Sequence, residues 1–134
     1  MKFLLDVNAL VALGVVEHQF HRQATKWVRA LRTEGNHKLF TCSITELGFV
    51  RILSNTKAYG FTVSTAGALL HRVKTEDEDL FSFVTDDQDA SRLPGWVHHP
   101  KQVTDGHLAQ LAKANRAALA TLDRGIPGAF VIKE

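Results

Sequence analysis

Short apolar runs alternate with stretches of helical periodicity along the whole chain, and this alternation constrains the fold more than any other feature. Strands are expected at residues 2–5, 38–41, 80–84 and 118–122, with a weaker one at 129–132. Strands separated by helices pair in parallel through crossover connections. The sequence therefore predicts a three-layer α/β/α fold with a mainly parallel central sheet, formed by a single domain over residues 1–134.

The stretches between the expected strands carry apolar residues at spacings of three and four. In segment 18–32 this spacing places Trp27 on an apolar face. The helix at 43–54 is apolar on most sides, which is typical of a buried helix or one that binds a partner. We expect Ser43, Ser64 and Thr104 to begin or cap the remaining helices. Segment 86–103 is expected to form a short helix and a loop.

Chain length and composition exclude several protein classes. A chain of 134 residues can bury a core without covalent staples. Its one cysteine, Cys42, excludes an intramolecular disulfide and a multi-cysteine zinc site. Asp6 interrupts the apolar start too early for a secretory leader, and no apolar stretch is long enough to span a membrane. We therefore expect a cytoplasmic protein with no membrane contact.

Four acidic residues follow strands or begin helices. Asp6 and Asp123 end the strands at 2–5 and 118–122, and Glu46 lies in the first turn of the helix after 38–41. Ligands of open parallel sheets bind at the carboxyl ends of the strands, so these three are expected at one edge. Asp105 begins the last helix and joins them if that helix starts at the same edge.

Each acid also has a local explanation. Asp6 is a good helix cap, Ser43 and Glu46 match a capping box, Asp105 suits a helix N-terminus and Asp123 suits a turn. As a set, however, converging carboxylates repel one another unless a cation lies among them or some stay protonated. Oxygen ligands without His or Cys favour Mg²⁺ or Mn²⁺, which serve metal-assisted phosphoryl chemistry.

Four segments around these acids carry a family likeness. Residues 4–10 (LLDVNAL), 43–47 (SITEL), 103–112 (VTDGHLAQLA) and 120–125 (ATLDRG) resemble, in order, the acidic motifs of PIN-domain nucleases. Each segment alone is a weak signal, but as an ordered set they span nearly the whole chain. The small size resembles the VapC-type toxins of bacterial toxin–antitoxin pairs.

This resemblance implies a Mg²⁺- or Mn²⁺-dependent endoribonuclease that cleaves RNA with a metal-activated water and leaves a 5′-phosphate and a 3′-hydroxyl. It implies that the catalytic and metal-binding residues are Asp6, Glu46, Asp105 and Asp123. Asp6 and Asp105 would be the most direct ligands, and a carboxylate of Glu46 or Asp123 would accept the proton of the water. Asn8 and Thr104 match supporting polar positions. A cognate antitoxin and a homodimer are also implied.

The small net charge of +2 conceals a strong local imbalance. Residues 76–89 hold seven of the 14 acidic residues and no Lys or Arg, and the acids are expected in a solvated loop and helix cap that flank the strand at 80–84. The other 120 residues carry 16 basic and seven acidic residues, a net charge of +9. Arg22, Lys26 and Arg29 then form a candidate track for an RNA backbone, with Arg124 as a further phosphate contact; a merely solvated helix face is the alternative.

Other functions stay open from the sequence alone. A metal-free ribonuclease would need paired histidines, but the adjacent His98 and His99 would point apart. His107, one turn from Thr104, is a candidate neighbour of the acids, not an expected one. Another phosphoryl-transfer enzyme, such as a phosphatase, would need a placed lysine, and only Lys101 lies near a motif. A non-catalytic PIN-like binding module is the third alternative. Trp96 is expected either to pack locally or to stack on a base.

Overall fold

A five-stranded sheet forms the centre of the computed structural model, which describes residues 1–134. The strands are ordered β3-β2-β1-β4-β5 and every neighbouring pair is parallel. Their bounds are Lys2–Leu5 for β1, Lys38–Thr41 for β2, Phe81–Phe83 for β3, Ala118–Thr121 for β4 and Phe130–Val131 for β5. All five strands lie where the apolar runs predicted them, although β3, β4 and β5 are shorter.

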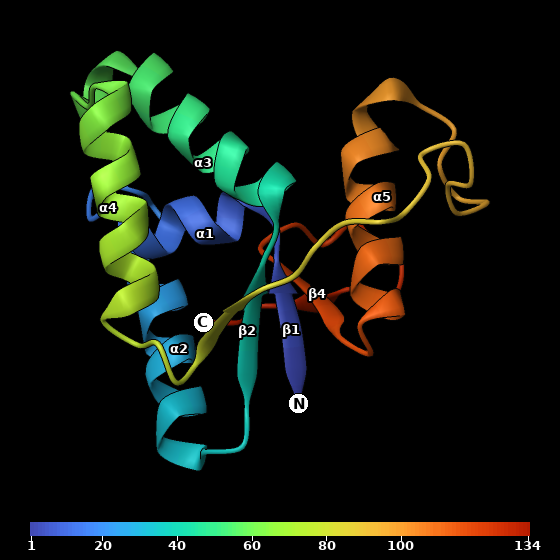
Figure 1. The fold of residues 1–134 in the computed structure, drawn as a ribbon, viewed down its shortest axis with the longest axis horizontal. Helices are drawn as coiled ribbons and strands as arrows, with labels where there is room; N and C mark the ends of the chain where they lie inside the picture. Colours follow the sequence, from blue (N-terminus) through green and yellow to red (C-terminus); the bar gives the residue numbers. More distant parts are fainter.

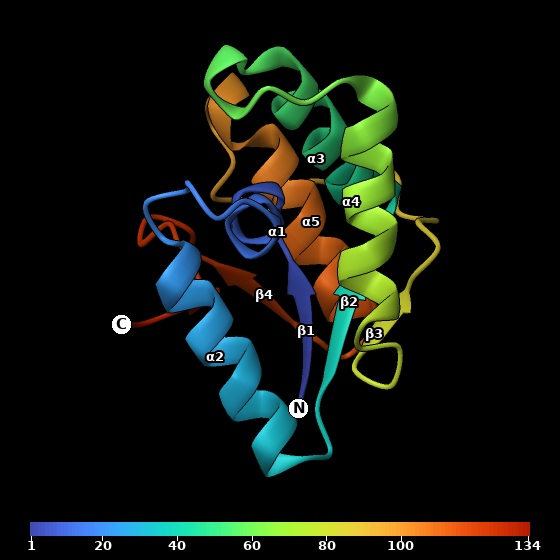
Figure 2. The same ribbon diagram turned by 90° about the vertical axis from the view of Figure 1, so that its left-hand side faces the viewer.

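Five α-helices cover the two faces of this sheet (Figures 1 and 2). One face is covered by α1 (Val7–Gly14), α2 (His21–Glu34), α3 (Ser43–Asn55) and α4 (Val63–Thr75). The other is covered by α5 (Val103–Ala114). Short 3₁₀ turns at Lys57–Tyr59 and Pro100–Gln102 precede α4 and α5. The predicted three-layer α/β/α architecture is thus confirmed.

The side chains of β1 show how the sheet divides the core. Successive residues of a strand point to opposite faces. Phe3 and Leu5 accordingly pack with the helices α1 to α4, whereas Leu4 packs with α5. Trp27 lies edge-on against Phe3, with ring centroids 5.1 Å apart. Trp27 therefore faces the core, as its helical spacing predicts.

The starts of α3, α4 and α5 differ from the sequence prediction by one or two residues, and α2 begins at His21, three residues after the start of the periodic segment. Cys42, not Ser43, is the N-cap of α3, and the Cys42 N–H donates to the Thr45 hydroxyl at 3.0 Å. Cys42 is extended because it links β2 directly to the helix, so Ser43 already lies in the first turn. Thr62 caps α4, ahead of the predicted start at Ser64. Thr104 does not cap α5, because the 3₁₀ turn leads straight into that helix at Val103.

Segment 86–99 contains no α-helix, so the short helix expected within 86–103 is present only as the 3₁₀ turn at Pro100–Gln102. No helix is both long and apolar enough to pass through a membrane.

Candidate active site at the strand edge

The carboxyl ends of the strands and the start of α5 lie at the same edge of the molecule. In Figure 1 the strands run upward, and α5 begins at the top of its face and runs down toward β4. Asp6 follows β1, Asp123 lies just beyond β4, and Asp105 is in the first turn of α5. The direction of α5, which the sequence left open, therefore brings Asp105 to this edge.

Asp6 is the most buried of the four acids, with 6% of its surface exposed. Its Oδ1 accepts the Ala9 N–H at 2.8 Å, so it caps α1 as predicted, and it is also hydrogen-bonded by the Thr121 hydroxyl. The pKa of Asp6 is raised to about 6, mainly by burial; the charges of Asp105 and Asp123 add to this rise, and the two hydrogen bonds oppose it.

Asp105 and Asp123 complete a group of neighbouring carboxylates with Asp6, which we call the acidic trio. Partial burial raises the pKa of Asp105, and the charge of Asp123 adds to this rise. Asp123 is exposed and also forms the predicted turn, because its Oδ1 accepts the Gly125 N–H at 2.8 Å. The three side chains are therefore close enough for the charges of Asp105 and Asp123 to act on Asp6, and for that of Asp123 to act on Asp105.

Sequence reasoning missed a buried threonine that links two members of the trio. Thr121 is the last residue of β4 and is fully buried. Its hydroxyl is hydrogen-bonded to Asp6 and accepts the Asp123 N–H at 2.9 Å. The sequence does contain a signal for this contact: Thr121 is the only polar residue of an otherwise apolar strand, and a buried hydroxyl needs a hydrogen-bond partner.

Glu46 is held by a different set of contacts. Its Oε2 accepts the Thr41 hydroxyl and the Lys74 ammonium group, each at 2.6 Å. The neighbouring charges that raise the pKa values of Asp6 and Asp105 belong to the trio and do not include Glu46. Lys101 is the only lysine close to a motif along the sequence, but the fold brings a second one, because α4 places Lys74 against Glu46. The expectation that no other lysine lies near a motif was therefore wrong.

The chemistry of the acidic trio fits a divalent cation. Its donors are carboxylate oxygens, the ligands that Mg²⁺ and Mn²⁺ prefer, and their mutual repulsion is what a bound cation relieves. No three His, Cys, Asp or Glu side chains are gathered closely enough to hold a metal ion as they stand. A cation would therefore have to draw these carboxylates together.

The predicted supporting residues lie around the trio with few contacts. The Asn8 amide oxygen is 3.1 Å from Nε2 of His18, and Asn8 is exposed in the first turn of α1. Thr104 is exposed in the first turn of α5, next to Asp105. Arg124 is exposed beside Asp123 and forms no ion pair within the chain.

His107 lies one turn into α5 and pairs with an acid of the 76–89 run. Its Nε2 is 2.6 Å from Oδ2 of Asp86, and both side chains are largely buried. Asp77 of the same run pairs with Arg32. The expectation that this run is simply solvated is therefore wrong for these two acids, each of which ties the run to a helix.

The segment before α5 packs tightly on the start of that helix. A Cβ atom added to Gly106 would lie only 2.3 Å from Cγ2 of Val97, so glycine is required for this approach. The Gln110 side chain also donates to the carbonyl oxygen of Arg92. Together with the His107–Asp86 pair, these contacts place the first turn of α5, and hence Asp105.

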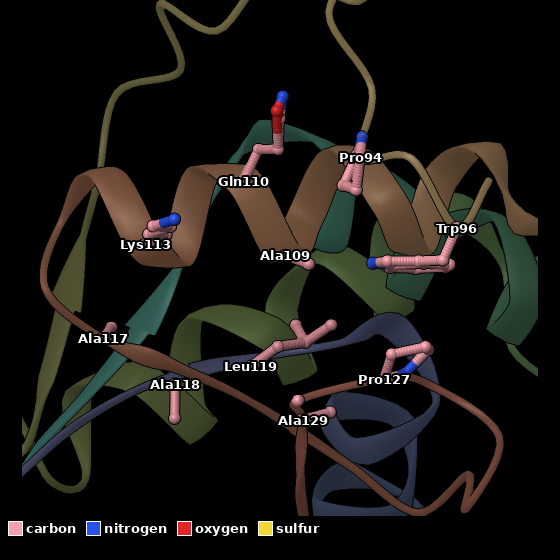
Figure 3. Close-up of a pocket in the computed structure, with 11 residues that line it drawn as sticks. Pro94, Trp96, Ala109, Gln110, Lys113, Ala117, Ala118, Leu119, Pro127 and Ala129 are labelled. Atoms are coloured by element: carbon pink, nitrogen blue, oxygen red, sulfur yellow. The ribbon is translucent and has the colours of Figure 1, made fainter.

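A separate groove of about 500 Å³ lies between α5 and β4 (Figure 3). Trp96 lines it and packs against the core cluster on the α5 side of the sheet. None of the four acids lines this groove. The local packing role considered for Trp96 is therefore present, and the groove is not the candidate site.

The predicted basic stripe forms one side of an open groove of about 710 Å³ along α2. Arg22, Lys26 and Arg29 line it together with uncharged polar residues and Glu134. These three cations are exposed and form no ion pair within the chain, unlike Arg32, which pairs with Asp77. The stripe therefore presents free positive charge to solvent.

Comparison with known proteins identifies similar sequences over nearly the whole chain. The PIN domain family model matches residues 3–129. Ribonuclease VapC38 of Mycobacterium tuberculosis is 36% identical over 128 residues, covering 92% of this chain and 86% of the relative. Ribonuclease VapC44 of the same species is 34% identical over 130 residues, covering 94% and 89%.

Solved structures share the fold at lower identity. A chain in the crystal structure of VapBC2 from Rickettsia felis, bound to a DNA fragment from its promoter, has a TM-score of 0.64 at 15% identity, covering 98% of this chain and 97% of that chain. A chain of FitAB bound to an IR36 DNA fragment has a TM-score of 0.55 at 20% identity, covering 92% and 87%. These likenesses concern the arrangement of helices and strands.

Proposed function

Because the chain belongs to the PIN-domain family, we propose that it is a metal-dependent endoribonuclease of the VapC type, acting as a single domain and neutralised by a cognate antitoxin. The observation that carries this proposal is the acidic trio. Asp6, Asp105 and Asp123 come from three separate elements and lie close enough that the charges of Asp105 and Asp123 raise the pKa of Asp6, and the charge of Asp123 raises that of Asp105. Such an arrangement is costly unless a cation or a proton offsets the charge.

The trio would hold Mg²⁺ or Mn²⁺, with Asp6 and Asp105 as the most direct ligands and Asp123 completing the set. When bound, the cation supplies charge stabilisation at the scissile phosphate and activates the attacking water. The free trio repels a polyanion, so neutralisation of these carboxylates is also what admits an RNA phosphate.

The protein's own residues would do the remaining work. A carboxylate, Glu46 or Asp123, takes the proton of the attacking water, which leaves a 5′-phosphate and a 3′-hydroxyl. Glu46 suits this role because Oε2 accepts both of its hydrogen bonds and Oε1 accepts none within the chain. Asn8 and Thr104 are placed to orient neighbouring polar groups, being in the first turns of α1 and α5.

RNA would be held by basic residues along α2 and by one arginine beside the trio. Arg22, Lys26 and Arg29 are unpaired along α2, and Arg124 is exposed next to Asp123. Contacts of such cations with phosphates give affinity that depends on salt and little on sequence. They therefore supply binding, while the trio supplies cleavage.

Protein partners would use the apolar surface of α3 and α4. Leu47 is 65% exposed on α3, and Val63 is 66% exposed at the start of α4. Exposed large apolar residues on two neighbouring helices favour contact with another chain. We include both a homodimer and an antitoxin complex in the proposal; the similar solved structures are themselves VapBC and FitAB assemblies.

An RNA cleavage assay tests the function. The purified protein is incubated with end-labelled RNA in Mg²⁺, in Mn²⁺ and in excess chelator, beside Asp105→Asn and the control Glu78→Gln, an exposed acid away from the strand edge. We expect cleavage by the protein and the control only with a divalent ion, and none by Asp105→Asn.

Other outcomes of this assay identify the alternatives. RNA binding without cleavage in any ion indicates a non-catalytic module. Hydrolysis of a small phosphate ester but not of RNA indicates another phosphoryl-transfer enzyme. Full cleavage in excess chelator would contradict metal dependence and point to histidine-based catalysis.

A further inference from the structure

Lys74 occupies an unusual place for a surface lysine. It comes from the last turn of α4, 28 residues after Glu46, and its Nζ is 2.6 Å from Oε2 of Glu46. Only 28% of the Lys74 side chain and 19% of the Glu46 side chain are exposed. The ammonium group also lies 5.5 Å from the centroid of the Phe83 ring, at the end of β3. The Lys74 ammonium group is therefore held between the Glu46 carboxylate and the Phe83 ring.

The contacts of Glu46 differ in kind from those of the acidic trio. The trio is surrounded by like charges, whereas Glu46 has a cation and a hydroxyl donor on the same oxygen. Thr41, which supplies the hydroxyl, is fully buried at the end of β2 and cannot move without the strand. The Glu46 side chain is thus fixed at Oε2 by groups from two other elements, and Oε1 is left without a partner.

We propose that Lys74 is a positioning residue for catalysis, which holds Glu46 by one oxygen and leaves the other to take the proton of the attacking water. This inference rests on the proposed function. Lys74 also adds one positive charge beside the acids, so the strand edge carries three uncompensated carboxylates instead of four. Lys74 and Glu46 then act as one unit, so that the loss of either residue removes the same contribution to the cleavage rate.

A direct role on RNA is the competing explanation for a lysine near a nuclease site. A lysine that bound the substrate phosphate would affect the affinity for RNA, and its effect would persist after Glu46 had been changed. A positioning lysine acts through Glu46, so its effect falls on the rate at saturating RNA and disappears when Glu46 is already neutral.

The test uses single-turnover and steady-state RNA cleavage by Lys74→Met, Lys74→Arg, Glu46→Gln and the double variant Lys74→Met/Glu46→Gln. Arg72→Met is the matched control, since Arg72 is an exposed cation on the same helix, paired only with Glu76. It removes the same charge without touching Glu46. Thermal melting of each variant establishes that the protein is folded.

We expect Lys74→Met to lower kcat about 10-fold or more with KM changed less than about 3-fold, within the range of general-base contributions. Arg72→Met should change either constant less than about 2-fold, and Lys74→Arg should recover part of the rate. The double variant should be no slower than Glu46→Gln alone. A rise in KM with unchanged kcat, or a further loss in the double variant, would overturn the positioning role.

A second measurement needs no RNA. Calorimetric titration with Mn²⁺ should show about 3-fold or tighter binding by Lys74→Met than by the unchanged protein, because one repelling charge has gone. Arg72→Met should bind Mn²⁺ like the unchanged protein. Weaker or equal binding by Lys74→Met would overturn the charge argument. If the unchanged protein cleaves no RNA, the proposed function fails, while these titrations still decide whether Lys74 acts on the acids.

Discussion

Replacing Asp6 with asparagine should stabilise the metal-free protein at neutral pH. Asp6 is buried, and its pKa lies at about 6 instead of 3.8 because burial and the neighbouring acids disfavour the charged form. Above pH 6 the Asp6 carboxylate is ionised in the folded protein although it is buried, which lowers the free energy of unfolding. Asparagine keeps the cap on Ala9, since Asn and Asp are comparable at N-caps, and removes the charge.

The magnitude follows from linkage. A rise in pKa from 3.8 to about 6 corresponds to about 3 kcal/mol, at about 1.4 kcal/mol per pKa unit. An acid with a raised folded pKa stabilises the fold below its unfolded pKa, and this contribution is lost as the pH rises through the folded pKa. The stability of Asp6→Asn relative to the unchanged protein should therefore increase by about 2–3 kcal/mol between pH 4 and pH 7.

Urea denaturation in excess chelator at several pH values measures this difference directly. Glu78→Gln is the control, because it removes an exposed acid and should show no comparable pH dependence. Mg²⁺ should stabilise the unchanged protein but not Asp6→Asn, because only the former retains the ligand. A constant or falling stability difference between pH 4 and pH 7 would refute the reasoning that Asp6 is a strained carboxylate.

Three further predictions concern the surroundings of the trio. Gly106→Ala should cost about 1–3 kcal/mol in thermal or urea unfolding, because the new Cβ meets the packed loop at 2.3 Å, whereas Gly67→Ala, with open space, should not destabilise the protein. Thr121→Val should cost about 1–3 kcal/mol at pH 7 and less at pH 4, because the ionised form of the buried acid loses a donor; an equal loss at both values would contradict this. Changing Arg22 and Lys26 to Glu should weaken RNA binding and reduce the slope of log affinity against log salt concentration by up to about 2. Unchanged binding would mean that this stripe is a solvated surface that does not contact RNA.

The sheet could be predicted because its signals are local. Buried parallel strands appear as short apolar runs, and crossover helices appear as periodic stretches between them. The same logic placed Asp6 and Asp123, since each directly follows a strand and so must lie at its carboxyl end. The family likeness relied on these acids and their order along the chain.

The contacts of the site could not be predicted in the same way, because they join distant segments. Lys74 meets Glu46 only because α4 packs beside α3 and ends near β3. Asp86 reaches His107 through a long connection whose path no periodicity describes. The position of Asp105 depended on the direction of α5, which tertiary packing decides.

Local capping was also decided by context. Ser43 is a better capping residue than cysteine by preference, yet Cys42 is the residue at which the chain leaves β2 in an extended conformation. Thr45 then takes the capping partner position, and Glu46 is free for its contacts with Thr41 and Lys74. A shift of one residue in the N-cap therefore replaced the capping role expected for Glu46 by contacts with Thr41 and Lys74.

RNA cleavage by folded Asp6→Asn in Mg²⁺ tests the central claim most directly. Urea denaturation of the same preparation first shows whether the variant is at least as stable as the unchanged protein at pH 7.5. We predict a stable variant that cleaves RNA at least about 100-fold more slowly, because the buried carboxylate serves catalysis at the expense of stability. A stable variant that retains full Mg²⁺-dependent cleavage would contradict the assignment of the acidic trio as the active site.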